Sequence, residues 1–488
     1  VDDQPIDTLF GPREKEHDSI EPEIVLKLVQ QALTDTSGLV RLTLASALQR
    51  LPVESRGELA QALAFRSEDI NDHNLPHVVW AGMIPLVELD PEKLLEVARS
   101  TEWSNLRTWI ARAITERSKE NPVAFAALLK LVGDQTKQAD SLLAGIERAV
   151  LGMKGFLKPA KWNQISSKLQ GNPYVLKLSV LFGDKDAIGQ MEKLVMNPDA
   201  EIEVRRQTMK ILIDSNSPNL KSISDKLLKS VGMKIWAARG LSKFEDNRTG
   251  EMLVSSLQAF DGVEKDEVVE ILCGRINWAD VLLSGIENGQ VSKSLISPYH
   301  ALQIKSLKND KLDKRLDQCW GMIRTSPEYL AKRKGELKKE LNSEAVSKAD
   351  LKNGSLLYDQ QCSSCHRLYG KGGKLGPDLT GSGRSNLDYL LENIVDPNSA
   401  VSADYRMNII QLKDGRILSG MIAQQDRNSL TLRMPGSDTV VSKSMVEKRE
   451  TLSHSIMPAG LLDNLSLNAR RDLIAYLMNP TQVSRPAQ

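Results

Sequence analysis

Helical periodicity over residues 20–340 is the feature that most constrains the fold of this 488-residue chain. Apolar residues recur there at three- and four-residue spacing, and turn residues interrupt the pattern. The predicted helices come in consecutive pairs, such as PEIVLKLVQQAL with VRLTLASALQRL and NPVAFAALLKLV with SLLAGIERAVLGM. The pairs recur at roughly 30 to 45 residues, which is the period of stacked helical hairpins. We therefore expect a mainly α fold, with a helical solenoid over residues 1–345.

The starts of several second helices share a dipeptide pattern: Val40-Arg41, Leu106-Arg107 and Val204-Arg205. This pattern resembles HEAT repeats, in which a similar dipeptide begins the inner helix. The resemblance implies a HEAT-like solenoid, and an irregular helical domain is the alternative. A densely charged segment from Tyr329, YLAKRKGELKKELNSEAVSKAD, predicts a solvated helix that leads into a linker. We therefore expect a domain boundary near residues 345–350.

The sequence changes character after residue 350, since all seven tryptophans precede that point. A helix is predicted over residues 354–370, and SNLDYLLENIVDP predicts a second helix that ends before Pro397. Residues 404–452 alternate like strands around two turn signals, Asp414-Gly415 and Pro435-Gly436, which predicts a small antiparallel β insertion. LNARRDLIAYLMNP predicts a terminal helix capped by Ser466 or Asn468. The second predicted domain thus comprises residues 346–403 and 453–488.

The stretch QQCSSCHRLYG places Cys362, Cys365 and His366 in a C-x-x-C-H pattern. Covalent haem attachment needs two thiols, one for each vinyl group, and a neighbouring imidazole for the iron. A zinc site would need a second cysteine pair, and a thioredoxin-like dithiol would need a preceding strand where a helix is predicted. The remaining cysteines, Cys273 and Cys319, lie in helical windows and are predicted to be buried thiols. The motif favours one covalently attached haem c.

The residues that precede the motif extend it to G-x3-Y-x3-C-x2-C-H, with Gly354 and Tyr358 at four-residue intervals. This pattern resembles the first helix of class I c-type cytochromes. The resemblance implies that Gly354 allows the terminal helix to cross closely and that Tyr358 packs at the crossing. KLGPDLTG resembles the segment beneath the haem in that family. The match implies that Tyr358 and Leu375 belong to the haem-binding residues and that the Pro377 carbonyl accepts a hydrogen bond from the His366 ring.

A second axial ligand is expected in a loop shortly before the last helix. SIMPAGL places Met457 there, whereas Met434, which also precedes a proline, ends a predicted strand. His454 is the rival ligand, and its alternative interpretation is an exposed loop histidine. With His366 and Met457 both bound, the iron has no open position, so the site is expected to move single electrons.

The order of these features resembles the haem-binding C-terminal region of planctomycete-type (PVC-group) cytochrome c proteins. The resemblance rests on the helical repeats, CSSCH, LGPDLTG, IVDPN, the β insertion and SIMPAGL. Many members carry an upstream β-propeller that resembles sugar dehydrogenases, so the resemblance implies a dehydrogenase as redox partner. EDINDHNLPHVVW is similar to a segment that precedes the repeats in this group.

That same segment offers Asp69, Asp72, His73 and His77 as metal-binding groups. We favour the interpretation of a helix start, with Asn74 as its cap and Pro76 in its first turn. No metal other than the haem iron is therefore expected.

Charge and hydropathy exclude other classes of function. Lys and Arg total 64 against 63 Asp and Glu, so nothing drives the chain toward nucleic acid. No apolar run approaches the roughly 18 residues of a membrane-spanning helix, and no signal-peptide pattern opens the chain. Covalent haem attachment implies an exported, periplasmic protein. The predicted function is single-electron transfer from a dehydrogenase. The alternatives are a haem enzyme or sensor with an open iron site, and a repeat scaffold with a secondary haem domain.

Overall fold

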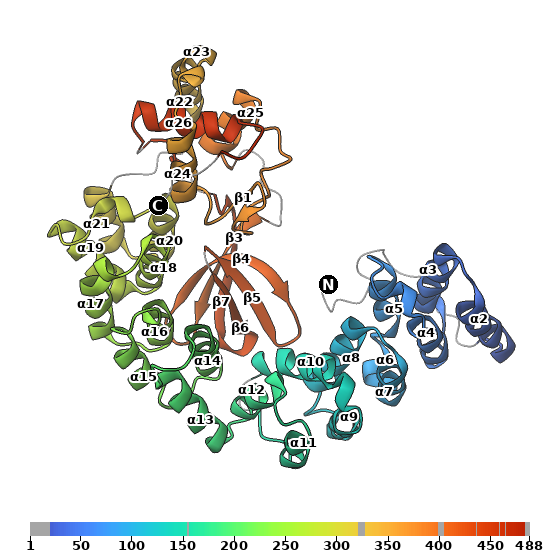
Figure 1. Ribbon diagram of the computed structural model, residues 1–488. Helices are drawn as coiled ribbons and strands as arrows, with labels where there is room; N and C mark the ends of the chain where they lie inside the picture. Colours follow the sequence, from blue (N-terminus) through green and yellow to red (C-terminus); the bar gives the residue numbers. More distant parts are fainter. Residues whose placement is uncertain are drawn as a thin grey trace. The chain divides into compact units, whose positions relative to one another are not determined.

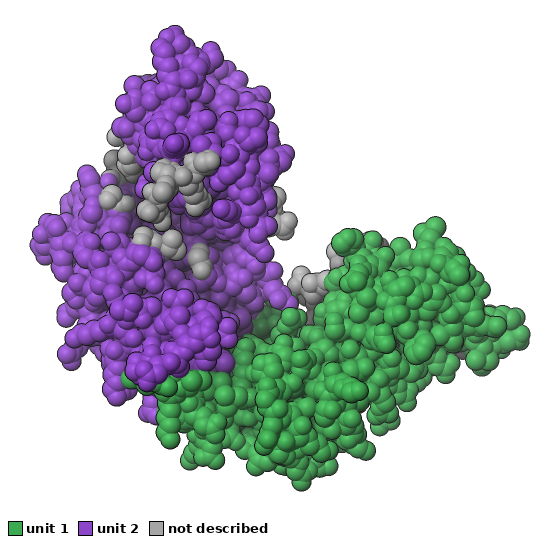
Figure 2. All heavy atoms as spheres, viewed as in Figure 1, with its two compact units in different colours: residues 1–197, 214–217, 425–429 green, residues 198–213, 218–424, 430–488 purple. Residues whose placement is uncertain are grey.

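The computed structural model describes residues 20–153, 156–320, 327–398, 405–435, 437–457, 459–463 and 465–483. The described chain is mostly helical and carries a small antiparallel sheet (Figure 1). Its contacts form two compact units (Figure 2): residues 1–197 with 214–217 and 425–429, and residues 198–213 with 218–424 and 430–488. The predicted boundary at residues 345–350 lies inside the second unit. None of the helices in the described ranges is long and apolar enough to cross a membrane.

The first unit is built from helices that contact the next but one along the chain, for example α2 with α4, α3 with α5 and α8 with α10. This contact pattern is the one that stacked helical hairpins produce. One hydrophobic core runs from Ala32 to Phe182. The helices are α2 Pro22–Thr34, α3 Gly38–Ala47, α4 Arg56–Ala64, α5 Leu75–Met83, α6 Leu86–Leu89, α7 Pro91–Ser100, α8 Ser104–Glu116, α9 Pro122–Asp134, α10 Ala139–Leu151, α11 Trp162–Lys168, α12 Pro173–Leu181 and α13 Lys185–Met196.

Two arginines of the Val-Arg pattern, Arg41 and Arg107, are buried in this unit. Arg41 in α3 donates from Nε to Oδ2 of Asp69 at 2.5 Å and from Nη2 to Oδ1 at 2.6 Å. Arg107 in α8 is also buried, and its Nε lies 2.9 Å from Oγ of Ser141. Each charged head therefore joins its helix to a segment further along the chain.

The segment before α5 is a helix start with Asn74 at the N-cap position, as we expected, but another side chain makes the capping hydrogen bonds. The Asp72 carboxylate accepts hydrogen bonds from the backbone N–H of Asn74 at 2.8 Å and of Leu75 at 2.7 Å. Asn74 takes the predicted N-cap position, but its own side chain makes no capping bond. Asp69 is occupied by Arg41. Within the described ranges, no three His, Cys, Asp or Glu side chains gather in a way that suits a metal ion.

The second unit continues with paired helices, in which α17 contacts α19, α18 contacts α20 and α19 contacts α21. Its helices are α14 Ile202–Asp214, α15 Leu220–Leu227, α16 Lys234–Leu241, α17 Asn247–Ser256, α18 Gly262–Cys273, α19 Ile276–Glu287, α20 Pro298–Ser306, α21 Asp310–Cys319, α22 Pro327–Glu340, α23 Ser343–Ser347, α24 Leu351–Gln361, α25 Leu387–Val395 and α26 Leu467–Met478. The Cys273 thiol is buried and that of Cys319 partly buried, and both are free.

The predicted β insertion forms a five-stranded sheet in the order β6-β5-β4-β3-β7. The strands are β3 Arg406–Leu412, β4 Ile417–Gln425, β5 Ser429–Met434, β6 Ser437–Ser442 and β7 Val446–Ser455. β3 pairs antiparallel with both β4 and β7, with Asn408 opposite Gly420 and Thr451. Gly415, at the predicted turn between β3 and β4, has φ +79°, the left-handed conformation that favours glycine. Gly436 of the other turn signal lies outside the described residues.

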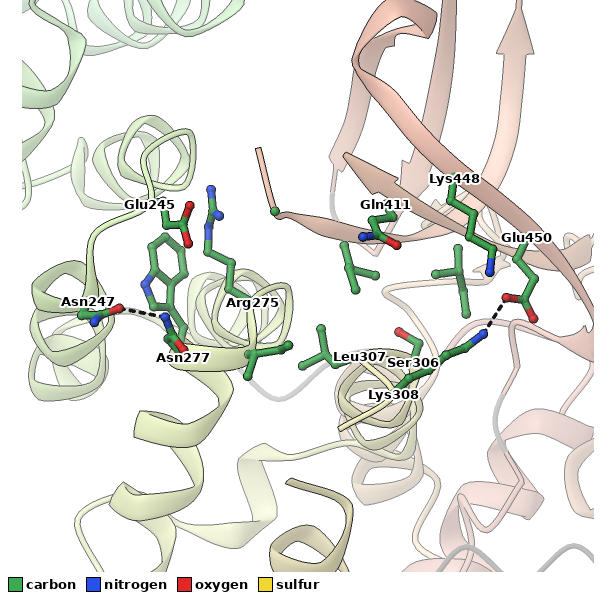
Figure 3. Close-up of a pocket in the computed structure, with 15 residues that line it drawn as sticks. Glu245, Asn247, Arg275, Asn277, Ser306, Leu307, Lys308, Gln411, Lys448 and Glu450 are labelled. Atoms are coloured by element: carbon green, nitrogen blue, oxygen red, sulfur yellow. Dashed lines mark hydrogen bonds and ion pairs between the residues drawn. The ribbon is translucent and has the colours of Figure 1, made fainter. Parts of the chain in front are cut away.

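Two of the places at which the sheet is bonded to helices of its own unit flank one pocket. At one, the N–H of Ile417 donates to the carbonyl of Gly274 at 2.9 Å, and Nη1 of Arg275 donates to the carbonyl of Asp414 at 2.8 Å. At the other, Nζ of Lys308 lies 2.8 Å from Oε2 of Glu450. Figure 3 shows the pocket between these two contacts, which is lined by residues of both. None of the candidate site residues lines this pocket.

Candidate functional site

The crossing of α24 and α26 positions the segment that carries the cysteine motif. The Asp350 carboxylate caps α24 by accepting from the N–H of Lys352 and Asn353, and Ser466 caps α26 through the N–H of Ala469. A Cβ on Gly354 would stand 2.1 Å from the carbonyl oxygen of Asp472, so the two backbones touch where glycine leaves room. The rings of Tyr358 and Tyr476 pack beside the crossing, with centroids 5.8 Å apart.

The motif itself lies in a turn and not in a helix. We predicted a helix over residues 354–370, but α24 ends at Gln361, because Cys362 adopts φ −125° and leaves the helical conformation. The N–H groups of Cys365 and His366 both donate to the carbonyl of Cys362, at 3.1 and 2.8 Å. The hydroxyl of buried Tyr358 donates to the carbonyl of His366 at 2.7 Å. The two thiols and the imidazole therefore belong to one tight turn, which α24 holds in place through the Tyr358 hydroxyl.

Both motif thiols are free and partly buried. Burial raises the pKa of the Cys362 thiol to about 12 and that of the Cys365 thiol to about 11. A redox-active dithiol needs a lowered pKa, because the thiolate is the reactive form. The environment of these cysteines therefore does not favour thioredoxin-like chemistry.

The imidazole of His366 is held by the loop that follows the small β1–β2 hairpin (Arg367–Leu368 and Lys371–Gly372). Its Nδ1 lies 3.0 Å from the carbonyl oxygen of Pro377. Burial lowers the pKa of His366, so the ring is neutral at pH 7 and Nδ1 carries the proton that it donates to this carbonyl. Nε2 is then left with a free lone pair, which is the state of a metal-ligating histidine.

A cavity brings the motif together with the predicted second ligand. Cys362, Cys365, His366 and Pro377 line it, and so does Met457, whose N–H donates to Oγ of Ser455 at 3.1 Å. Leu375 is buried in the apolar cluster that contains Cys365, and neither Leu375 nor Tyr358 is among the described lining residues. The side chain of His454 lies outside the described part of the structure.

The comparison with protein families agrees with this arrangement. Residues 351–410 match the family model for cytochrome c. The chain contains a cytochrome c domain. The domain implies a covalently bound haem c and haem-based electron transfer, and such domains are typically extracytoplasmic. No curated protein matches the chain closely enough to serve as a relative.

The residues of the cytochrome c domain fit a haem. Two thiols, an imidazole with a free nitrogen and a thioether line one cavity, and the side chains between them are largely apolar. Arg384 is buried in the wall, where Nη1 donates to the carbonyl of Leu477 at 2.7 Å and Nε has no partner in the described structure. This cation suits the carboxylates that a haem carries.

The sequence did not predict the part of the cavity wall that residues outside the cysteine motif contribute. Asp266 of α18, and Ser297 and Tyr299 at the start of α20, line the cavity from the predicted solenoid, and Arg384 lies in the loop before α25. Asp266 and Arg384 are the only Asp, Glu, Lys or Arg residues among the described lining residues. No local pattern distinguishes these positions, because their role depends on a fold that joins segments up to 211 residues apart, from Asp266 to Leu477.

Proposed function

We propose that this protein is a monohaem c-type cytochrome that transfers single electrons, with His366 and Met457 as the axial ligands of the iron. One observation carries the proposal: both side chains line the same cavity as Cys362 and Cys365. The hydrogen bond between His366 and Pro377 supports it, because the bond leaves Nε2 free to bind a metal.

The residues of the site have separate roles in this proposal. A bound haem c supplies a one-electron couple between ferric and ferrous iron. Cys362 and Cys365 hold the group through thioether bonds, and His366 and Met457 fill both axial positions, which excludes oxygen or peroxide as a ligand. The thioether of Met457 favours the ferrous state and so raises the potential. Apolar wall residues such as Leu390, Ile394 and Leu461 keep water away from the iron.

The rest of the chain supports a role as an electron-transfer module. The stacked helix pairs and the buried Arg41 and Arg107 support a HEAT-like solenoid of the kind found in planctomycete-type cytochrome c proteins. In this proposal the electron donor is a dehydrogenase, either associated or fused as an upstream β-propeller. The protein works outside the cytoplasm, where haem is attached covalently.

Absorption spectra of the ferric and ferrous protein, produced with haem-attachment machinery, test the ligand set. We expect a low-spin ferric spectrum with the weak near-infrared band of methionine ligation, and loss of that band in Met457→Ala. Met434→Ala is the matched control, because Met434 also precedes a proline but ends strand β5. A high-spin spectrum that Met457→Ala leaves unchanged would reject Met457 as ligand and favour ligand chemistry at an open iron.

A further inference from the structure

A buried carboxyl group lies behind Tyr299, a residue that lines the haem cavity. Glu270 of α18 is 5% exposed and Tyr299 of α20 is 6% exposed. The Tyr299 hydroxyl oxygen lies 3.1 Å from Oε1 of Glu270 and 2.9 Å from the carbonyl oxygen of Ser419 in β4. A phenol has one proton, and the Ser419 carbonyl can only accept. Both contacts are hydrogen bonds when Glu270 is protonated, because its carboxyl group then donates to the phenol oxygen while the phenol donates to the Ser419 carbonyl.

Among the described residues, no cation near Glu270 is free to pair with it. Arg239 on α16 points its guanidinium at Glu267, with bonds of 2.5 and 2.7 Å. His300 on α20 is buried, and burial lowers its pKa, so the ring is neutral at pH 7. In the described part of the chain, the titratable and charged groups around Glu270 are Asp266, Glu267 and Cys273 on its own helix, Arg239, Tyr299, His300 and Cys365.

Burial raises the pKa of Glu270 well above the ordinary value for a glutamate, and the negative charges of Glu267 and Asp266 raise it further. The hydrogen bond with Tyr299 and the charge of Arg239 act in the opposite direction and are weaker. Buried glutamates with a pKa of about 8 to 9 are known. Glu270 is therefore a carboxyl group whose protonation can respond to a change of charge nearby.

Tyr299 connects this carboxyl to the haem cavity. Its ring lines the cavity, and it packs in the apolar cluster that contains Cys365, Leu375 and Ile456. One side chain thus joins Glu270 to the cysteine that holds the haem. Charges interact strongly across such an apolar layer, because little water screens them. The charge state of the iron and that of Glu270 are expected to depend on each other.

We propose that Glu270, held by Tyr299, takes up a proton when the haem is reduced and releases it when the haem is oxidised. The inference rests on the proposed electron-transfer function. In the reducing step, one electron enters from a one-electron donor and one proton from solvent binds the Glu270 carboxylate. In the oxidising step, both leave. Asp266 lies one helical turn before Glu270 on the same face of α18, and its side chain is 43% exposed, so it connects this face to solvent.

The direction of the effect follows from the charges. Reduction removes one positive charge from the iron, which favours the protonated Glu270, so the pKa of Glu270 is higher in the reduced protein than in the oxidised protein. Between these two values, the reduction potential falls as pH rises. The slope approaches the limit of one proton per electron, about 59 mV for each tenfold change in proton concentration. Outside that range the potential does not depend on Glu270.

The test is a redox titration followed by haem absorbance, at pH values between about 5 and 9, a range that brackets known buried glutamates. We expect a sloping region in the native protein and a flat line at the same pH in Glu270→Gln, which keeps the size of the side chain and a hydrogen bond to Tyr299. Asp266→Asn is the matched control. It removes one of the negative charges that raise the pKa of Glu270 but keeps the Glu270 carboxyl, so the slope is expected to remain and to move to lower pH.

A second measurement on the native protein covers the case in which Glu270→Gln does not fold. The infrared difference spectrum between the reduced and oxidised protein should contain the C=O stretch of a carboxylic acid that gains its proton on reduction. A potential that is flat with pH in the native protein, a slope that survives in Glu270→Gln, or a difference spectrum without the carboxyl band overturns the inference. The near-infrared methionine band, recorded on the same samples, reports separately on the proposed axial ligation.

Discussion

The imidazole Nδ1 of His366 and the carbonyl oxygen of Pro377 lie 3.0 Å apart, and the residue before this proline, Gly376, packs against the ring. A Cβ on Gly376 would stand 2.5 Å from Cε1 of the His366 ring. The loop therefore lies flat against the imidazole, and this close contact lets the Pro377 carbonyl reach Nδ1. The hydrogen bond fixes both the tautomer and the orientation of the ring.

Gly376→Ala should disturb the imidazole without changing its chemistry. The added methyl group overlaps the ring, so either the loop or His366 must move, at a cost of about 1–3 kcal/mol. We expect a lower yield of haem-loaded protein and a shifted or lost near-infrared methionine band. Gly381→Ala is the matched control in the same segment, because a Cβ there meets nothing within 4 Å. Equal spectra for both variants would contradict the contact.

Gly354→Ala should destabilise the cytochrome c domain. Its Cβ would overlap the carbonyl oxygen of Asp472 and lie 2.7 Å from Cβ of Tyr476, so α24 and α26 would have to separate. We expect a loss of about 1–3 kcal/mol in the free energy of unfolding, measured by denaturant titration. Gly335→Ala, at an exposed position of α22, should instead raise stability by about 0.5–1 kcal/mol, because nothing obstructs the methyl group and alanine favours the helix. A neutral Gly354→Ala would show that the crossing is looser than described.

Asp472→Asn should remove a pH-dependent contribution to stability. Burial acts to raise the pKa of Asp472, but hydrogen bonds from Asn353, the Asp350 N–H and Arg471 outweigh it and lower the pKa below its usual value. A lowered pKa in the folded state stabilises the fold above the unfolded value of about 3.9, and the contribution is lost as pH falls through the folded value.

The free energies of unfolding of the native protein and Asp472→Asn, measured between about pH 2 and pH 7, check this sign. We expect the variant to be less stable by about 1–3 kcal/mol at neutral pH, because an amide N–H replaces one acceptor. The difference should shrink below about pH 4. If the difference in the free energy of unfolding stays constant down to about pH 2, the variant is destabilised by altered packing and not by loss of the charge.

Several features followed from short-range patterns. The strands around the Asp414-Gly415 turn, the terminal helix and its Ser466 cap are confirmed, because turn and cap preferences act within a few residues. The two cysteines and the histidine of the motif lie within five residues, so any compact conformation keeps them close. The sequence alone thus determined the cytochrome c motif, the succession of helical pairs before it and the β insertion after it.

Other features depended on the tertiary structure. The helix before the motif ends at Gln361 and not near residue 370, because the turn is held by contacts with Gly373 and Tyr358. At the start of α5, Asp72 and not the N-cap residue Asn74 makes the capping hydrogen bonds, since its carboxylate reaches the N–H groups two and three residues further on. Tyr299 joins the haem cavity, and Glu270 bonds to Tyr299, only once the folded chain brings α18, α20 and β4 together. Local propensity carries no information about such distant partners, because burial and packing select them only once the chain is folded.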